Sequence, residues 1–322
     1  MKTKKWEELI SESDDAYFFH SPMWAKIMEK TYDFRDSTQF FEVNGKEILV
    51  PMMKRKKYGF NFLHSMPFGY GGFFSESSIN SGDIKSLINK IIGERNLIFN
   101  FMIPPLLNLS FDFEKPLITE IKDSWNYTHI LPANSDYEHF LRNRYNRKTR
   151  RAIKKAVKND VEIRKGDSLD DFRAFYDIYD KASKKWGYEN PEHPFDLYKN
   201  MYKYGSDHVD LNLAIKDNET IGGVIALNYG KNIYLWGSAF LAEFGALNPV
   251  SLLFNDIIKN AYDNGYEYVD FGESGDLSGV KKFKESFGAE NIRLNRFKVC
   301  SKIGRLALNV YERTSSISAI NI

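Results

Sequence analysis

The alternation of apolar and polar positions predicts a run of short elements between residues 39 and 103. Alternating residues at 39–43 and 47–51 predict two strands, and the dipeptide Asn44-Gly45 between them is typical of a hairpin turn. A third strand is expected at 61–67. The stretch continues with the glycine-rich loop Gly69-Tyr70-Gly71-Gly72, a helix at 82–93 and a strand at 97–103.

A second stretch, between residues 211 and 271, repeats this order. It begins with strands at 211–215 and 221–229 around the turn Asp217-Asn218. It continues with a strand at 232–240, a loop at 243–248, a helix at 249–264 and a strand at 266–271. Both stretches have the order β-β-β-loop-α-β, which favours a duplicated module. They share element order and not residues, so chance recurrence of a common α/β pattern is the alternative.

These elements predict an α/β (α+β) fold made of two tandem modules, each with a mixed, mostly antiparallel sheet flanked by helices. We place the boundary near Pro132, after a strand at 127–131. The modules then cover residues 1–132 and 133–322. Residues 302–322, which begin with a helix expected at 302–314, could pack back on the first module.

The composition excludes several classes of protein. Of 322 residues, 43% are hydrophobic and 15% aromatic, which is enough to bury a core and excludes global disorder. The net charge of +2 argues against a histone-like protein, and the single cysteine, Cys300, cannot form an internal disulfide. The sequence shows no secretory signal and no run of about 18 apolar residues. We therefore expect a cytoplasmic protein without a spanning helix, with contact at the inner face of the membrane left open.

Residues 142–158 hold nine basic side chains and no acidic one. Tyr145, Thr149, Ile153 and Ala156 recur at helical spacing, which predicts a helix with a basic face suited to phosphate. The phosphate could belong to a lipid- or nucleotide-linked precursor, to tRNA or to anionic lipids, and a solvated basic helix is the alternative. Outside this segment the chain has 36 basic and 43 acidic residues, so the near-neutral net charge conceals a basic stripe on an acidic body.

Several short motifs follow one another along the chain. They are Ser21-Pro22-Met23-Trp24-Ala25-Lys26, the segment 65–72 with its glycines, the basic segment 148–153, and Asp270-Phe271-Gly272 followed by residues 283–288. In this order they resemble the signatures of the Fem-type family, which has a GNAT-like acyltransferase fold. That family comprises peptidoglycan aminoacyltransferases and related envelope and exopolysaccharide proteins.

The resemblance implies two GNAT-like modules, the first on the acceptor side and the second on the donor and catalytic side. It implies an N-acyltransferase that moves an aminoacyl group from aminoacyl-tRNA, or an acyl group from acyl-CoA, to an amine of a cell-envelope, peptidoglycan or polysaccharide precursor. That precursor bears phosphate on a lipid or a nucleotide. No cofactor is expected to bind tightly. The chain has no obvious coiled-coil arm of the kind that some family members carry, so nothing supports tRNA handling by such an arm.

The resemblance also assigns individual residues. Phe283 and Lys284 match a Phe-Lys pair at the acyl-transfer centre, where a fixed ammonium would stabilise an oxyanion or the charge of the departing donor. A lysine on the helix surface, beside Lys281 and Lys282, is the alternative. Arg150 and Lys26 match residues that contact a pyrophosphate of the acceptor, and Trp24 lies in the same motif as Lys26. By position, the glycine loop 69–72 would bind the acceptor, because its backbone can approach a ligand closely; a tight turn is the alternative.

Two further assignments come from the residues themselves. An amine must be neutral to attack, so a proton acceptor is needed. Glu273 and Asp270 are the nearest carboxylates in sequence, and we take Glu273 as the base. Asp270 could equally be a structural residue at the end of its strand, and groups of the acceptor or water are alternatives to Glu273. Tyr234 and Trp236 alternate on one predicted strand and share a face, which could line the pocket or pack in the core.

The donor side is expected at the start of the helix at 249–264. Asn248 and Pro249 are typical of an N-cap and a first helical residue. Gly245 and Ala246 precede them, and Phe240 ends the preceding strand. Backbone N–H groups there would suit the pyrophosphate of CoA or the terminal adenosine region of tRNA. An ordinary capped helix is the alternative.

Other chemistries find no motif. The six histidines have no paired-ligand spacing, and GxGxxG, GxxxxGK[ST] and GxSxG are absent, so metal, dinucleotide, P-loop and serine-nucleophile interpretations are not supported. We therefore expect direct transfer in a ternary complex. The alternatives from other classes are a non-catalytic RNA- or anion-binding protein that uses residues 142–158, and an inactive scaffold that retains the fold.

Overall fold

The computed structural model describes residues 2–57, 60–92, 96–107, 118–121, 127–133 and 136–305. The chain divides into two compact units. Unit 1 comprises Met1–Tyr32 and Asp123–Leu294, and unit 2 comprises Asp33–Lys122 and Asn295–Ile322. Each unit is therefore assembled from segments that are distant in the sequence.

Unit 1 is built on a seven-stranded sheet with the strand order β14-β8-β13-β12-β11-β10-β9. β12 and β13 are parallel and are joined through α8 (Pro249–Asp263), whereas the other neighbouring strands are antiparallel. The strands are β8 (Tyr127–Pro132), β9 (Glu162–Gly166), β10 (Val209–Lys216), β11 (Glu219–Tyr229), β12 (Asn232–Phe240), β13 (Tyr268–Glu273) and β14 (Glu290–Arg293).

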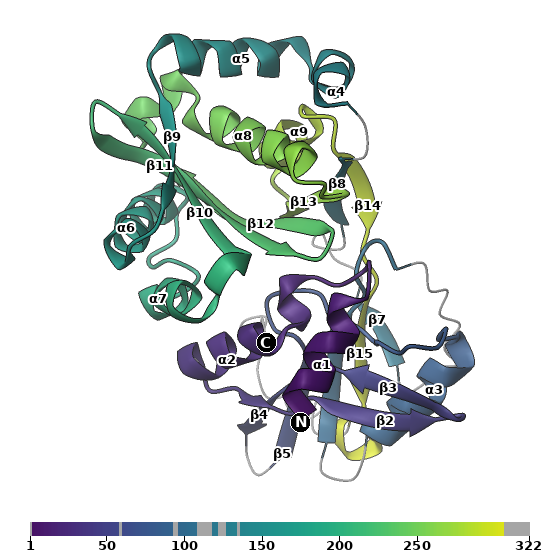
Figure 1. Ribbon diagram of the computed structural model, residues 1–322. Helices are drawn as coiled ribbons and strands as arrows, with labels where there is room; N and C mark the ends of the chain where they lie inside the picture. The colour runs from purple at the N-terminus through teal and green to yellow at the C-terminus, as the bar shows by residue number, and fades with distance from the viewer. Residues whose placement is uncertain are drawn as a thin grey trace. The chain divides into compact units, whose positions relative to one another are not determined.

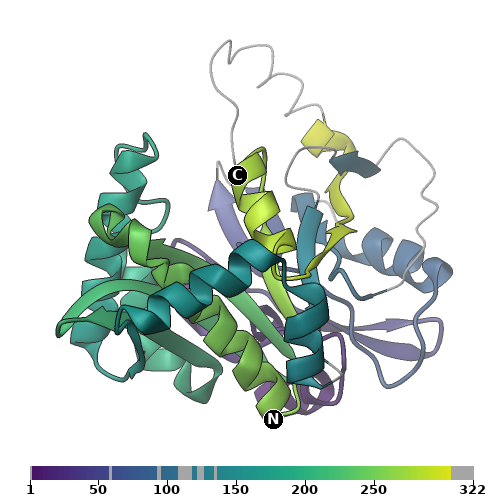
Figure 2. The same cartoon turned by 90° about the horizontal axis from the view of Figure 1, so that it is seen from above.

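Helices cover both faces of this sheet (Figure 1). α8 packs on one face with Leu253 and Ile257, and α5 (Arg147–Lys158) crosses α8 on the side away from the sheet (Figure 2). The opposite face carries α6 (Leu169–Lys185), α7 (Phe195–Tyr204) and α2 (Pro22–Thr31). The remaining short helices of unit 1 are α1 (Lys2–Ser11), η1 (Phe18–His20), α4 (Tyr137–Arg144), η2 (Ser206–His208), η3 (Ala242–Leu247) and α9 (Ser278–Glu285).

Unit 2 contains a six-stranded sheet with the order β1-β4-β5-β6-β15-β7, and a separate hairpin of β2 and β3. β5 and β6 are parallel and flank α3 (Ser81–Ile91), as β12 and β13 flank α8 in unit 1. α3 buries Ile84, Leu87 and Ile88 against one face. The strands are β1 (Arg35–Asp36), β2 (Gln39–Val43), β3 (Lys46–Val50), β4 (Met53–Lys57), β5 (Phe60–Ser65), β6 (Asn96–Met102), β7 (Ile118–Ile121) and β15 (Arg296–Cys300).

The predicted fold class is confirmed, since both sheets are mixed and mostly antiparallel with helices against them. Both predicted hairpin turns are present, and Asn44, Gly45, Asp217 and Asn218 all have positive φ, as such tight turns require. The hairpin of unit 2 forms its own sheet, and α6 and α7 had no counterpart in the predicted pattern. The expected helix at 302–314 is helical at 302–305, and the rest of it lies outside the described residues.

The division of the chain differs from the predicted modules 1–132 and 133–322. β8 pairs with β13 and β14, so this strand belongs to the sheet of unit 1. The segment Met1–Tyr32 also joins unit 1, whereas β15 pairs with β6 and β7 in unit 2. Strand pairing between distant segments, which the local pattern does not encode, sets these boundaries.

The basic segment 142–158 is not one helix. It is interrupted between α4 and α5 at Tyr145 and Asn146. Asn146 is the N-cap of α5, where its side chain accepts a hydrogen bond from the Thr149 backbone N–H at 2.8 Å. The Tyr145 ring is buried against Phe140 and Phe287. In the described part of the chain, no helix combines the length and the apolar character that a membrane span requires.

Candidate functional site

The geometry of the site begins with a β-bulge near the end of β13. Asp270 pairs with Ile130 and Glu273 with Thr128, so three steps on β13 face two steps on β8. Gly272 lies inside this bulge with φ of 71°, a conformation that glycine adopts without strain. A Cβ atom at this position would lie 2.9 Å from the Tyr234 hydroxyl oxygen. The glycine is therefore needed both for its backbone angle and for its lack of a side chain.

Lys284 reaches this bulge from α9. Its side chain is buried, with 6% of the residue exposed, and its Nζ donates hydrogen bonds to the carbonyl oxygens of Gly272 at 2.9 Å and Glu273 at 2.7 Å. Burial lowers the pKa of Lys284 to about 8, while the charges of Asp270 and Glu273 oppose this decrease. An ammonium has three N–H donors, and these two carbonyls accept from two of them. The remaining donor can serve a ligand.

The other two predicted catalytic residues lie next to Lys284. Glu273 ends β13 and is half-buried, and its backbone carbonyl is one of the two acceptors for Lys284. Phe283 is also half-buried, and its ring packs edge-on against Phe254 at 5.3 Å and Phe287 at 5.2 Å. Phe283 therefore anchors α9 in the core, and its neighbour Lys284 points at the bulge.

The parallel ladder beside the bulge is short. β12 and β13 pair through three residue pairs, the last of which is Tyr234 with Asp270, although β12 continues to Phe240. On its other edge β12 has a second bulge, because Ile225 pairs with Gly237 and Ala226 pairs with Leu235. In this register Trp236 is the extra residue of the bulge and is not paired with a residue of β11. The two strands thus diverge beside Lys284, and the polypeptide there is irregular on both strands.

A cluster of aromatic rings fills the face of β12 that is turned away from α8. Trp24 lies 5.1 Å from Trp236, and Phe19 lies 4.9 Å from Tyr234, both as ring-centroid distances in edge-to-face contacts. Tyr234 and Trp236 are partly exposed, whereas Trp24 is fully buried. Trp24 thus packs against the Trp236 ring in the core and has no exposed surface for a ligand, unlike the substrate contact that was predicted. The sequence pattern grouped Tyr234 and Trp236 correctly.

The predicted donor residues lie at the start of α8. Asn248 is the N-cap and Pro249 the first helical residue, as expected, but Asn248 has φ of 58° and its side chain makes no capping hydrogen bond. Its Nδ2 instead donates to the carbonyl of Ala246 at 3.2 Å. The expected loop at 243–248 is the short helix η3. Gly245 lies under the Phe240 ring, where a Cβ atom would come within 3.1 Å of it.

The predicted phosphate contacts occupy different positions. The Arg150 guanidinium donates from one nitrogen to the carbonyls of Arg142 at 2.8 Å and Tyr145 at 2.6 Å, and so closes the end of α4. Lys26 is exposed on α2, with Nζ 4.5 Å from the centre of the Tyr204 ring. Arg150 therefore has a structural task at the break between α4 and α5, with its second terminal nitrogen still available to an anion.

The glycine loop Gly69-Tyr70-Gly71-Gly72 belongs to unit 2. Tyr70 is buried, the Gly71 N–H donates to the Met102 carbonyl at 2.7 Å, and the Gly72 N–H donates to Ser65 Oγ at 3.2 Å. A Cβ atom on Gly71 would lie 2.3 Å from Ser65 Oγ. Close packing against β5 is thus a sufficient reason for glycine at position 71.

Two histidines and a tyrosine near these elements were not singled out by the sequence. His129 on β8 is 1% exposed, and its Nε2 lies 3.8 Å from Glu285 Oε1 on α9. His193, before α7, contacts the Trp236 ring and shares a 2.9 Å hydrogen bond with the Tyr32 hydroxyl. Tyr17 donates to Asp270 at 3.3 Å. β8 buries four consecutive residues, so no alternation marks His129, and nothing local links Tyr17 to Asp270.

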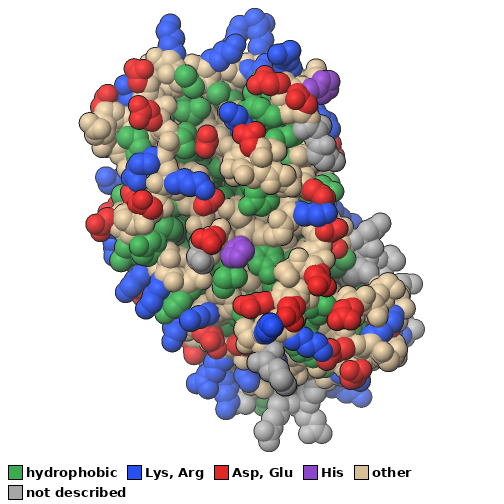
Figure 3. Space-filling model, viewed as in Figure 1, with side chains coloured by type: hydrophobic (Ala, Val, Ile, Leu, Met, Phe, Trp, Pro, Cys, Tyr) green, Lys and Arg blue, Asp and Glu red, His purple; other side chains and the backbone are tan. Residues whose placement is uncertain are grey.

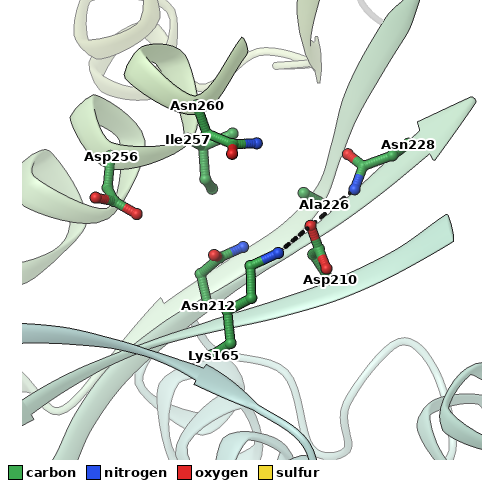
Figure 4. Close-up of a pocket in the computed structure, with 8 residues that line it drawn as sticks. All are labelled: Lys165, Asp210, Asn212, Ala226, Asn228, Asp256, Ile257 and Asn260. Atoms are coloured by element: carbon green, nitrogen blue, oxygen red, sulfur yellow. Dashed lines mark hydrogen bonds and ion pairs between the residues drawn. The ribbon is translucent and has the colours of Figure 1, made fainter. Parts of the chain in front are cut away.

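A small cavity of about 40 Å³ lies elsewhere in unit 1, between α8 and strands β9, β10 and β11 (Figure 4). Lys165 Nζ and Asp210 form an ion pair at 3.0 Å across it, and Asn228 donates to the same carboxylate at 2.8 Å. None of the predicted site residues lines it. Among the described residues, no cluster of three or more His, Cys, Asp or Glu side chains could hold a metal ion.

Comparison with known proteins places this geometry in a class. Residues 142–285 match the family model described as an acetyltransferase (GNAT) domain. They contain β12, α8, β13 and Lys284. No curated protein matches the sequence.

Solved structures show the same fold over nearly the whole chain. FemX aligns with a TM-score of 0.75 at 12% identity, covering 96% of this chain and 98% of FemX. A conserved protein of unknown function from Bacteroides thetaiotaomicron aligns with a TM-score of 0.61 at 10% identity, covering 93% and 97%. The C-terminal domain of a proposed lysylphosphatidylglycerol synthetase from Agrobacterium fabrum aligns with a TM-score of 0.58 at 11% identity, covering 99% and 98%.

Residues 142–285 thus match an acyltransferase domain of the GNAT type. Within that class the chain has the Fem-type architecture, like that of FemX.

Proposed function

We propose that this protein is an N-acyltransferase that transfers an aminoacyl group from aminoacyl-tRNA, or an acyl group from acyl-CoA, to an amine of a phosphate-bearing cell-envelope precursor. The observation that carries the proposal is the position of Lys284. A buried ammonium, held by the Gly272 and Glu273 carbonyls where two parallel strands diverge, offers a fixed donor to charge that develops on an acyl oxygen. The GNAT-type domain and the Fem-type resemblance supply the substrate classes.

The reaction is a direct transfer. A neutral amine attacks the acyl carbon, a C–N bond forms, and the negative charge that develops on the carbonyl oxygen is stabilised by Lys284. The C–O bond of an ester donor, or the C–S bond of a thioester donor, then breaks, and the proton of the amine passes to the departing oxygen or sulfur. In this scheme Glu273 accepts a proton from the incoming ammonium so that the attacking nitrogen is neutral. Removal of one oxyanion donor typically costs about 3 to 4 kcal/mol of transition-state stabilisation.

The basic face of α5 is the proposed contact for the phosphate of the precursor or of the donor. Seven cationic residues of α5 (Arg147, Lys148, Arg150, Arg151, Lys154, Lys155 and Lys158) stand opposite the buried Thr149 and Ala156. Lys and Arg side chains gather over this helix at the edge of the molecule (Figure 3). Such a surface attracts phosphate by charge and by paired hydrogen bonds. It is also the observation that favours the second candidate, an anion- or RNA-binding protein without catalysis.

A transfer assay distinguishes the two. Radiolabelled aminoacyl-tRNA and acyl-CoA pools are incubated with the protein and with lipid- and nucleotide-linked envelope precursors. The acyltransferase predicts label on an amine of one precursor, with a rate that falls at least about 100-fold in Lys284→Met. Lys282→Met, two residues away on the exposed side of α9, is the control. Binding of tRNA without transfer from either donor class would reject the acyltransferase and leave the binding protein.

A further inference from the structure

Asp270 is a buried carboxylate with three hydrogen-bond donors from three segments of unit 1. It is 1% exposed. Its Oδ1 accepts from Thr128 Oγ1 at 2.5 Å and from the Gly272 backbone N–H at 2.8 Å, and its Oδ2 accepts from the Tyr17 hydroxyl at 3.3 Å. Hydrogen bonds to a charged acceptor are short and strong, and a buried carboxylate needs them to remain ionised.

These hydrogen bonds fix the bulge of β13. Asp270 is the last residue before the register shifts, and Glu273, the first residue after it, is paired with Thr128. The same carboxylate oxygen therefore holds the bulged residue Gly272 and the opposite strand. A bulge turns the backbone away from its regular ladder. Here it turns the carbonyls of Gly272 and Glu273 toward the Lys284 Nζ.

The charge of Asp270 acts on the same lysine. Asp270 raises the pKa of Lys284 against the effect of burial, and Glu273 adds to this. Asp270 thus affects Lys284 in two ways, through the position of its two acceptors and through the electrostatic field. Its own oxygens are occupied by Thr128, Gly272 and Tyr17, so it is poorly placed to accept a proton from a substrate.

We propose that Asp270 is a positioning residue, which holds the bulge whose carbonyls accept hydrogen bonds from the Lys284 ammonium. Tyr17, in the N-terminal segment of unit 1, takes part through its hydrogen bond to the same carboxylate. The role of Asp270 in catalysis rests on the proposed acyl transfer, whereas its action on Lys284 does not.

The test uses the full-length protein and no substrate. Lysine Cε resonances are followed by NMR against pH, and the Lys284 signal is assigned as the one missing in Lys284→Met. Asp270→Asn keeps an oxygen that can accept from Thr128 and Gly272 but removes the charge, so we expect the Lys284 pKa to decrease below its wild-type value of about 8. Asp263→Asn, at the end of α8, is the control and should leave it unchanged. An unchanged Lys284 pKa in folded Asp270→Asn would overturn the proposal.

Two further variants keep the charge and test the position. Thr128→Val and Tyr17→Phe each remove one donor to Asp270. We expect the Gly272 amide, which donates to Asp270, to exchange with solvent at least about 10-fold faster in both, while amides of β10 keep their protection. These variants decide the question if Asp270→Asn does not fold. Unchanged exchange at Gly272 in both would contradict a positioning role.

An activity measurement distinguishes failure of this proposal from failure of the proposed acyl transfer. If the wild type transfers an acyl group, Asp270→Asn should lower kcat with little change in KM, and the alkaline limb of its pH profile should follow the lowered Lys284 pKa. If the wild type transfers nothing, the acyl-transfer proposal fails while the NMR result for Asp270 still stands.

Discussion

At the scale of single residues, Lys284 is an ionisable group that the fold removes from water. Desolvation disfavours its charged form, and the two carbonyls and the nearby carboxylates compensate only in part, so its pKa in the folded protein is about 8 against 10.5 in the unfolded chain. Between these values the unfolded state binds more protons than the folded state. The free energy of unfolding therefore rises as the pH increases through this window.

This gives a prediction that needs no substrate. The unfolding free energy of the wild type, relative to that of Lys284→Met, should increase between pH 8 and 10.5 by up to about 3 kcal/mol. Urea unfolding at pH 7.5, 9 and 10.5 measures it. Lys282→Met, which alters an exposed side chain on the same helix, should show a nearly constant difference from the wild type. A constant difference for Lys284→Met as well would mean that Lys284 is solvated in the folded state.

The sequence predicted Lys284 and Glu273 as catalytic residues, by motif and by proximity, and the structure brings both to one bulge. It did not identify the bulge. The conformation of Gly272 depends on Thr128, which lies more than 140 residues earlier in the chain, so no window around Gly272 contains the information. Arg150 illustrates the opposite case. Its basic character was evident, but its bonds to the carbonyls of Arg142 and Tyr145 depend on a helix break that periodicity did not predict.

At the scale of elements, α5 has one side that packs in the core and one side that is exposed and basic. Thr149 and Ala156 pack inward, and the exposed side is cationic. Of the basic residues on α5, none forms an ion pair with an acidic side chain among the described contacts of the chain, whereas Arg144 on α4 pairs with Glu290 at 3.3 Å. The charge of α5 is thus available to an external anion, and its attraction must weaken with salt.

Neutralising α5 should therefore weaken phosphate binding in a salt-dependent way. We expect the triple variant Arg151→Gln, Lys154→Gln, Lys158→Gln to bind total tRNA more weakly and to lower the slope of log affinity against log salt by about 2 to 3. Filter binding between 50 and 200 mM salt measures this slope. The control neutralises three exposed lysines of α6 (Lys181, Lys184 and Lys185). An equal loss in the control would assign the binding to net charge and not to α5.

At the scale of the whole molecule, the chain is divided differently from the two predicted tandem modules. Unit 2 takes β15 from the C-terminal region, and that strand lies between β6 and β7. Phe297 and Val299 of β15 are buried in the same core as Phe99 of β6. Burial of two such side chains contributes about 3 to 6 kcal/mol, which approaches the total stability of a domain.

Removal of residues 295–322 should consequently unfold unit 2 and spare the sheet of unit 1. Hydrogen exchange followed by mass spectrometry is expected to show loss of protection in β5 and β6 and retention in β10, β11 and β12. A shorter truncation, of residues 306–322 only, keeps β15 and serves as the matched control. Protection of β6 in the longer truncation would show that β15 is dispensable to that sheet.

The sequence by itself determined the local features. Two hairpins, the strand-helix-strand order of each stretch, the start of α8 at Asn248 and Pro249, and the basic and apolar faces of α5 all follow from residue spacing and turn chemistry, which act over a few residues. Tertiary structure decided which strands pair, to which unit β8, β15 and the first 32 residues belong, and how Asp270 and a bulge hold Lys284. Those outcomes depend on hydrogen bonds and packing between residues far apart in the chain, which local periodicity does not predict.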